Sequence, residues 1–455
     1  MTRHPPRLRA GAAFLLISAT LAVLGAGIAR ADAEPPLPPV HHVWVVNLEN
    51  KNYAETFTAG AGYLGGVLPT QGALLRQYYG TGHVSADNYV AQQAGQAPTA
   101  ETQSDCQEYT NVTPGTPTLG GQVIGQGCVY PASVGTLAGQ VAAAGLTWRG
   151  YLEDLGNDPT REETTCGRPL TTGGAVADPA AIPAAQDRTQ VATASDSYAA
   201  RHNPFVYFHS LTDSGACNAQ VGGLDRLAGD LASVASTPNY SLITPNLCND
   251  GHDTTCAGTN VAGGKTGGSV AADLWLQKYV PMITSSPAYQ QDGMLVVTFD
   301  EAEVGTASVP DAGACCGEPS GPNTAAPGIT GPGGGRVGAV VLSPYVAPGT
   351  VSDVGYNHYS LLRSIEDLLG IGTGGTDGQG HLGYAAQPVG VRQPTTTATA
   401  QTAPFVGFGS DVFTAGAAGN ALPEVPLPLL LPAAGAAVVV GTATWARRRR
   451  SAPTL

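Results

Sequence analysis

Short, mostly apolar runs of strand length recur along this chain, and longer segments with helical patterning separate them. The clearest runs are HVWVVN at residues 42–47, YSLIT at 240–244 and GMLVVTF at 293–299. Apolar periodicity predicts helices at 270–283 and 359–369. Apolar strands that alternate with helices are typical of α/β proteins. We therefore predict an α/β fold with a mostly parallel central sheet flanked by helices.

Less regular segments complete this prediction. We expect further strands at 147–151, 204–209 and 336–342, and further helices at 133–144 and 224–234. Residues 303–335 are rich in Gly, Pro and Cys and carry no regular pattern. Loops of this length are uncommon unless they are functional or cross-linked.

Both ends of the chain carry patterns that indicate location. Residues 2–9 contain three arginines, residues 10–29 are apolar and uncharged, and Ala29-Arg30-Ala31 has the small-x-small form of a cleavage site. This order predicts a signal peptide over residues 1–31, with an uncleaved N-terminal anchor as the alternative. Such a segment would export the rest of the chain.

At the other end, residues 427–446 are nearly all apolar, and four arginines follow at once. About 20 apolar residues span a bilayer core, and flanking arginines favour the cytoplasmic side. We therefore expect a transmembrane segment at 427–446 and a basic cytoplasmic tail at 447–455, which would leave the body at the cell surface. Attachment to the cell wall, or release, is the alternative.

Between these ends we predict a linker at 32–40, a catalytic domain at 41–395, and the stalk together with the end of the body at 396–426. The net charge of the chain is -13. An acidic exported body argues against a nucleic-acid partner, since such proteins need a basic surface.

Eight cysteines also fit export, because an even number in an oxidising compartment favours disulfides. Neighbours along the chain suggest three pairs and leave Cys315 and Cys316 over. The three pairs are Cys106–Cys128, Cys166–Cys217 and Cys248–Cys256. A zinc–thiolate site is the rival interpretation, but the CxxC spacing that it needs is missing from the sequence.

Polar side chains follow three of the predicted strands, where α/β sheets bind their ligands. Glu49 and Asn50 follow the first strand, and Asp300 and Glu301 follow the strand at 293–299. The third set follows the strand at 240–244 and comprises Asp250, His252 and Asp253. Oxygen ligands with one or two histidines suit a hard or borderline divalent cation. Each set alone is compatible with a helix cap or a turn, whereas three such sets favour a site.

A nucleophile for such a site is available in Ser85, which lies in a polar turn before an expected helix. A bound cation activates a serine by stabilising its alkoxide, and a helix N-terminus holds phosphate oxygens. An ordinary N-cap is the alternative for Ser85. His358 begins the last expected helix and is either a cap or part of the same site.

Seven motifs in these segments resemble one bacterial phosphoesterase family. In chain order they are HVWVVNLENKNY (42–53), HVSADNY (83–89), LTWRGYLEDLG (146–156), RHNPFVYF (201–208), TPNLCNDGHD (244–253), LVVTFDEAE (295–303) and YNHYSLLRSIEDLLG (356–370). The family includes acid phosphatases, phosphatidylinositol-3-phosphatase-like enzymes and, more distantly, phospholipases C. It is part of the alkaline-phosphatase-like superfamily, so the resemblance implies that fold.

The resemblance also implies roles for these residues. Ser85 resembles the nucleophile, and one metal site would use Glu49, Asn50, Asp300 and Glu301. A second metal site, or groups that hold phosphate or protonate the leaving oxygen, would use Asp250, His252, Asp253 and His358. Arg201, His202 and Asn203 are weaker candidates for substrate contacts, with a structural turn as the equal alternative.

Two departures from the family pattern affect these roles. Asp87 replaces the proline of the S/T-x-P-N pattern, and Cys248 stands where some relatives have aspartate. The second metal is therefore open, with His252 as acid and base beside a single metal as the other possibility.

The expected function is an exported hydrolase of phosphoric esters that uses one or two divalent metal ions. A phosphomonoesterase with a phosphoserine intermediate is favoured. A phospholipase C-like phosphodiesterase is the first alternative, and a non-catalytic surface protein on the same fold is the second.

Overall fold

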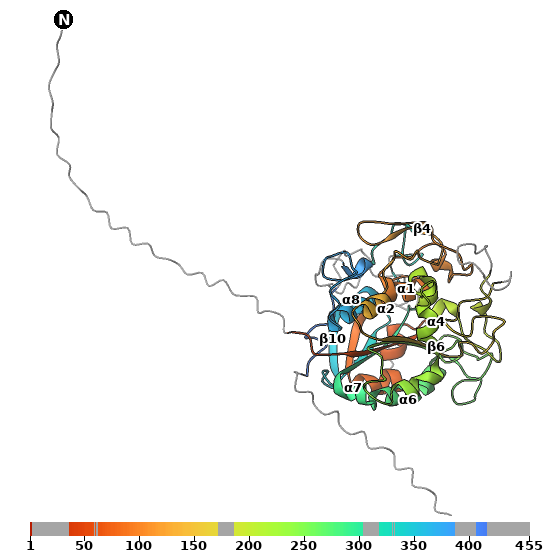
Figure 1. Ribbon diagram of the computed structural model, residues 1–455. Coiled ribbons are helices and arrows are strands. Elements are labelled where there is room, and N and C mark those ends of the chain that lie inside the picture. The colour runs from red at the N-terminus through yellow and green to blue at the C-terminus, as the bar shows by residue number, and fades with distance from the viewer. Residues whose placement is uncertain are drawn as a thin grey trace, which may run out of the picture. The chain divides into compact units, whose positions relative to one another are not determined.

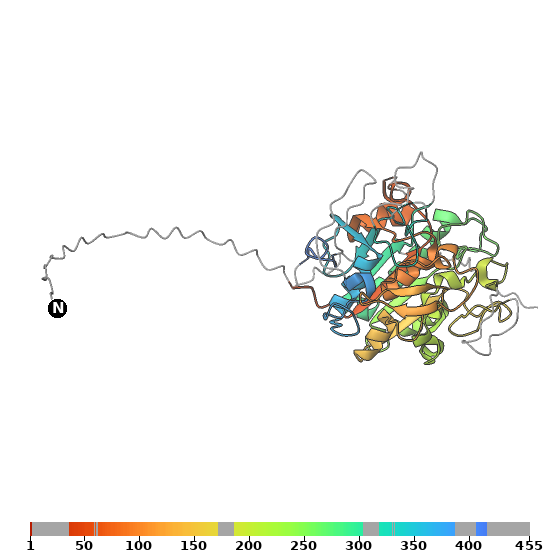
Figure 2. The same ribbon diagram turned by 90° about the horizontal axis from the view of Figure 1, so that it is seen from above.

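An eight-stranded sheet organises the computed structural model of the chain, in the order β10-β2-β9-β8-β1-β7-β5-β6. The strands are β1 His42–Leu48, β2 Ala73–Tyr79, β5 Trp148–Leu152, β6 Val221–Gly223, β7 Tyr240–Thr244, β8 Gly293–Phe299, β9 Ala339–Leu342 and β10 Thr350–Asn357. β9 runs antiparallel to both of its neighbours, and the other pairs are parallel. The predicted α/β fold with a mostly parallel central sheet is confirmed. β10 and β6 form the two edges of the sheet and are labelled on opposite sides of Figure 1, and Figure 2 shows the same ribbon from above.

The structure describes Met1 and residues 36–58, 60, 62–171, 186–303, 318–329, 331, 333–386 and 406–415. The predicted transmembrane segment and tail, Cys315 and Cys316 lie outside the described residues, as do almost all of the signal peptide, residues 32–35 of the linker and most of the stalk. Among the residues that are described, every helix is too short or too polar to cross a membrane.

The central strands form the core because every one of their side chains is buried. This holds for all seven residues of β1 and of β8, which pair in register from His42 with Gly293 to Leu48 with Phe299. Branched apolar side chains suit such strands, since they pack on both faces of a sheet. The apolar runs that predicted these strands therefore mark the middle of the sheet.

Helices cover both faces of the sheet (Figure 1). One layer contains α1 Ser85–Ala94, α2 Leu137–Ala143 and α8 His358–Leu368, and the other contains α6 Gly268–Thr284 and α7 Pro287–Asp292. α8 begins where the Asn357 side chain accepts a hydrogen bond from the Ser360 amide at 2.9 Å. This N-cap satisfies an amide that the helix itself leaves unpaired.

Smaller elements surround these layers. They are the hairpin of β3 Thr113–Pro117 and β4 Val123–Gln126 and the short helices α3 His209–Thr212, α4 Ala216–Gln220 and α5 Leu227–Asp230. The helix expected at 224–234 is thus limited to short turns that end at Asp230.

The strand predicted at 204–209 is wrong. Residues Pro204–Tyr207 form a 3-10 helix, and α3 begins at His209. Asn203 starts this turn, because its side chain accepts a hydrogen bond from the Phe205 amide at 3.2 Å. Proline in the first turn favours the same conformation. The segment is apolar because it is buried, which a short helix achieves as well as a strand.

Three disulfides cross-link the body, and they are the three that the sequence predicted: Cys106–Cys128, Cys166–Cys217 and Cys248–Cys256. They enclose separations of 22, 51 and 8 residues. Cross-links of this kind stabilise a fold by restricting the unfolded chain, and the effect grows with loop length.

The loop lengths predict unequal losses of stability. Replacing both Cys166 and Cys217 by alanine should lower the free energy of unfolding by about 4 kcal/mol, against about 2.5 kcal/mol for the Cys248 and Cys256 pair. Equilibrium denaturation of the two double variants and the wild type measures this. A larger loss for the pair with the shorter loop would contradict the prediction.

Candidate functional site

The carboxyl ends of β1, β7 and β8 bring three buried carboxylates together. Glu49 and Asp300 directly follow β1 and β8, and Asp250 lies in the segment after β7. The Glu49 amide donates to the Asp250 carbonyl at 2.9 Å, and the Asn50 amide donates to Asp300 Oδ1 at 3.2 Å. Parallel neighbours end at the same sheet edge, so residues distant in sequence meet there.

Helix α1 adds two hydroxyl groups to this cluster. Ser85 is the first residue of α1, and its Oγ donates to Glu49 Oε2 at 2.8 Å. Tyr89, one turn later, donates its hydroxyl to Glu49 Oε1 at 2.6 Å. Residues four apart share one face of a helix, so α1 presents both groups to the same carboxylate.

An imidazole completes the surroundings of Glu49. His202 stacks on the Tyr89 ring, with centroids 5.4 Å apart, and its Nε2 lies 3.2 Å from Glu49 Oε2. Burial acts to raise the pKa of Glu49, but the His202 imidazole and the hydroxyls of Tyr89 and Ser85 outweigh it and lower that pKa to about 2. Glu49 is therefore a carboxylate at any physiological pH.

The other two carboxyl groups have the opposite perturbation. Burial, followed by repulsion from Glu49, raises the pKa of both Asp250 and Asp300 well above the usual range. Within the described part of the chain, Oδ2 of each is buried and finds no hydrogen-bond partner, and the same holds for Oδ1 of Asn50. Buried polar atoms without partners are costly unless an ion or water satisfies them.

These donors fit a hard divalent cation, which takes carboxylate and amide oxygens. In the described residues, no three His, Cys, Asp or Glu side chains stand in an arrangement that could hold a metal ion as they lie. The fit therefore rests on the donor chemistry and the unsatisfied oxygens. Glu301, a predicted ligand, instead contacts the Nδ1 atom of His83, and burial lowers the pKa of His83 to about 4.

His358 is buried below the cluster and has both ring nitrogens engaged. Its Nε2 lies 2.5 Å from the Asp300 carbonyl, and its Nδ1 lies 3.1 Å from the Tyr78 hydroxyl and 3.0 Å from Gln92 Nε2. A carbonyl only accepts, so Nε2 carries the proton and Nδ1 accepts. Burial lowers the pKa of His358 to about 4, which keeps it neutral. These contacts position the backbone of Asp300.

The remaining predicted residues are less central. The side chains of His252 and Asp253 are 45% and 56% exposed and lie 3.5 Å apart at the surface. Arg201 lies 3.7 Å from Asp105, which accepts the Ala86 amide in the first turn of α1. The Asn203 amide donates to the Cys166 carbonyl and the Tyr198 hydroxyl, so it supports the local turn.

Sequence reasoning missed Tyr89 entirely and gave His202 only a weak substrate role. The spacing of four between Ser85 and Tyr89 within HVSADNY is a signal that was available. His202 gave no comparable signal, because its position against Glu49 depends on tertiary packing, including its stacking on Tyr89.

Comparison with known proteins agrees with the motifs. Residues 44–372 match the profile described as "Phosphoesterase family". A phosphate-repressible acid phosphatase of Penicillium chrysogenum is 23% identical over 304 residues, which are 67% of this chain and 53% of that protein. A phosphatidylinositol-3-phosphatase of Mycobacterium tuberculosis is 23% identical over 367 residues, 79% of this chain and 86% of that protein.

This chain spans about half the length, or less, of the fungal acid phosphatases that it matches. Among solved structures, a Vibrio parahaemolyticus protein of the alkaline phosphatase superfamily aligns with a TM-score of 0.39 and 10% identity, over 74% of this chain and 69% of that one. The phosphonate monoester hydrolase of Agrobacterium radiobacter aligns with a TM-score of 0.36 and 11% identity, over 74% of each chain. The family match runs from β1 to just beyond α8, and on that extent this chain belongs to the Phosphoesterase family.

Proposed function

We propose that this protein is a metal-dependent hydrolase of phosphoric esters, with phosphate monoesters as substrates and Ser85 as the nucleophile. One observation carries the proposal: Ser85 begins α1, and its hydroxyl donates to the buried carboxylate of Glu49 at 2.8 Å. Family membership and the relatives named as acid phosphatases support the same reaction class.

Each of these side chains has a distinct role in the proposed reaction. Glu49 orients the Ser85 hydroxyl, and Tyr89 fixes the second oxygen of Glu49. The N-terminus of α1 carries a partial positive charge that favours a phosphate group. Attack by Ser85 Oγ forms a phosphoserine as the bond to the leaving alcohol breaks, and water then hydrolyses this phosphoserine.

Protons have to move in both steps. We assign their transfer to His202, because its Nε2 lies 3.2 Å from Glu49 beside the Ser85 hydroxyl. The two histidines expected from the sequence are less suitable. His358 uses both ring nitrogens inside the protein, and His252 lies at the surface.

Glu49, Asn50 and Asp300 would hold a divalent cation, with Asp250 adjacent. The unsatisfied buried oxygens of Asn50, Asp300 and Asp250 support this assignment. A bound cation would neutralise phosphate charge and lower the pKa of the Ser85 hydroxyl. Glu301 would join the ligands only by giving up its contact with His83.

The test is an assay of the purified full-length protein on p-nitrophenyl phosphate and on bis(p-nitrophenyl) phosphate, from acid to alkaline pH, with and without a chelator. We expect monoester turnover that the chelator abolishes. Ser85→Ala should reduce kcat at least ~1000-fold, because it removes the attacking group. Ser104→Ala, at an exposed serine, is the matched control and should match the wild type.

Other outcomes separate the alternatives. Turnover of the diester alone would favour the phosphodiesterase. A folded, metal-loaded protein that is inactive on both esters would favour a non-catalytic surface protein. Full activity of the Ser85→Ala variant would refute the phosphoserine mechanism.

Tyr89→Phe tests the support of Glu49. A hydrogen bond to a charged group contributes about 1.5–3 kcal/mol, so turnover should fall roughly 10- to 100-fold. Loss of a donor to a carboxylate raises its pKa, so the acid limb of the kcat/KM profile should move to higher pH. Tyr63→Phe, at a partly buried tyrosine, is the control. An unchanged pH profile in Tyr89→Phe would exclude this role.

We also propose that the protein is exported and anchored at the cell surface by residues 427–446. The three disulfides support export, since such bonds persist in oxidising compartments. N-terminal sequencing of the protein from cells should find Asp32 or Glu34 first, and deletion of residues 427–455 should release it into the medium. A mature protein that retains residues 2–31 would contradict cleavage.

A further inference from the structure

A polar cavity of about 310 Å³ opens at the sheet edge that carries the carboxylate cluster. Its wall includes Glu153 and Asp154, which directly follow β5, and Asn246 and Asn249, which follow β7. Lys278 of α6 contributes a cationic group. The volume is at the lower end of the range for small-molecule sites.

The cavity and the proposed phosphate position both lie where strands of the sheet end. β7 separates β5 from β1 in the sheet, so Glu153 and Glu49 follow strands that are two positions apart. Neighbouring strands lie ~4.8 Å apart, so the ends of β5 and β1 are about 10 Å apart along this edge of the sheet. One segment joins the two places directly, since Asn249 lines the cavity and Asp250 belongs to the carboxylate cluster.

Hydrogen bonds hold the cavity wall in place. Glu153 Oε2 accepts from the Asn246 amide and from Asn249 Nδ2, both at 3.1 Å. Asp154 Oδ2 accepts from Asn246 Nδ2 at 2.7 Å. Asn249 in turn accepts the Val261 amide at 3.0 Å. A wall that is held before a ligand arrives loses little entropy on binding.

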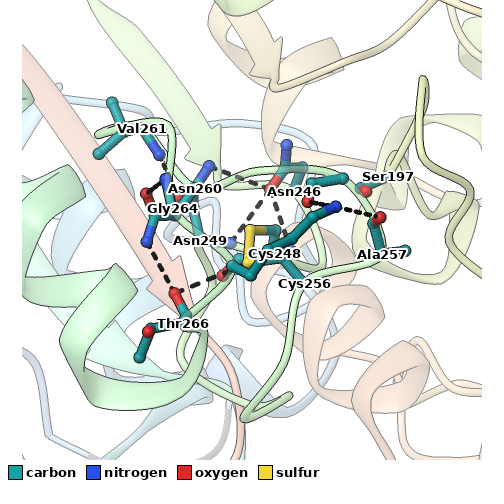
Figure 3. The surroundings of a disulfide bond; sticks show 12 residues. Ser197, Asn246, Cys248, Asn249, Cys256, Ala257, Asn260, Val261, Gly264 and Thr266 are labelled. Atoms are coloured by element: carbon teal, nitrogen blue, oxygen red, sulfur yellow. Dashed lines mark hydrogen bonds between the residues drawn. A yellow bond between two sulfur atoms is a disulfide. The ribbon is translucent and has the colours of Figure 1, made fainter.

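The loop that carries these asparagines is closed covalently. The Cys248–Cys256 disulfide lies between Asn246 and Asn260, and Figure 3 shows the hydrogen bonds that converge on both side chains. Asn260 also donates to the Thr266 carbonyl at 2.8 Å. The disulfide therefore fixes the lip of the cavity beside the cluster.

The chemistry of the wall limits what it binds. Apolar atoms contribute little to it, so an acyl chain or an aromatic ring would gain little there. The two carboxyl groups disfavour a second phosphate. Hydroxyl groups suit it, because carboxylates accept from them and an ammonium group donates to them. Lys278 is exposed, its ammonium group lies 4.8 Å from the centre of the Tyr279 ring, and it has no ion pair among the described residues.

Burial, more than any neighbouring group, raises the pKa of Glu153 to about 7. Near neutral pH this carboxyl group therefore exists in both forms and is able either to donate or to accept a hydrogen bond. Alcohols with several hydroxyl groups offer both kinds of partner.

We propose that this cavity is the subsite for the alcohol portion of the substrate, and that the enzyme selects phosphate esters of polyhydroxylated alcohols such as sugars and polyols. The proposal rests on the proposed function and specifies its substrate class. Glu153 and Lys278 are the residues that would contact the hydroxyl groups.

The test compares kcat/KM for sorbitol 6-phosphate and n-butyl phosphate in the full-length protein and in the variants Glu153→Gln and Lys278→Met. The wild type should prefer the sorbitol ester, and each variant should reduce the ratio of the two kcat/KM values about tenfold, as expected for one lost hydrogen bond to a charged group. Gln277→Met, at the exposed neighbour of Lys278 on α6, should leave both values unchanged. No preference in the wild type, or an equal loss on both esters, would overturn the proposal.

Failure of the proposed function can be distinguished from failure of the polyol subsite. If neither ester is hydrolysed, the hydrolase assignment fails, and binding of sorbitol itself by calorimetry then tests the cavity. Binding that Glu153→Gln and Lys278→Met weaken, but Gln277→Met does not, would retain the polyol site. Absence of sorbitol binding would overturn the polyol site, and so would binding of Ca²⁺ in the cavity instead of sorbitol.

Discussion

The buried carboxylate of Glu49 is the interaction on which the rest of the site depends. It ends the central strand, accepts hydroxyl groups from two turns of α1, and faces an imidazole from the segment before a short helix. Its own amide binds the segment after β7. Three other parts of the chain thus contact this one residue, α1 and the His202 segment at its carboxylate and the segment after β7 at its backbone amide.

Because neighbouring parallel strands end at the same edge of the sheet, the acidic residues that follow them converge there, and this convergence costs free energy. Neighbouring strands that end in acidic residues place like charges side by side in a dry environment, where repulsion is strong. The pKa shifts of the three groups are opposed. The partners of Glu49 lower its pKa and keep it ionised, whereas burial and repulsion from Glu49 raise the pKa of Asp250 and of Asp300. Such opposed perturbations at adjacent groups are common at functional sites.

The sequence predicted the parts of this protein that depend on local pattern. β1, β7 and β8 are mostly apolar runs, and Glu49, Ser85 and Asp300 stand directly beside predicted elements. β2 and β10 were not predicted, because their side chains alternate between buried and exposed and include charges. The surface position of His252 and the stacking of His202 on Tyr89 were also beyond prediction, since both depend on tertiary packing.

The reversed direction of β9 has a consequence for how such a protein can diversify. The chain leaves β8 at the edge that carries the site, and the backbone before β9 returns to the same edge, where Gly334 and Gly335 pair with Gly80. The connection therefore starts and finishes beside the site. Evolution or an engineer can lengthen, shorten or replace it, and so alter access to the site, while the pairing of the core strands stays the same.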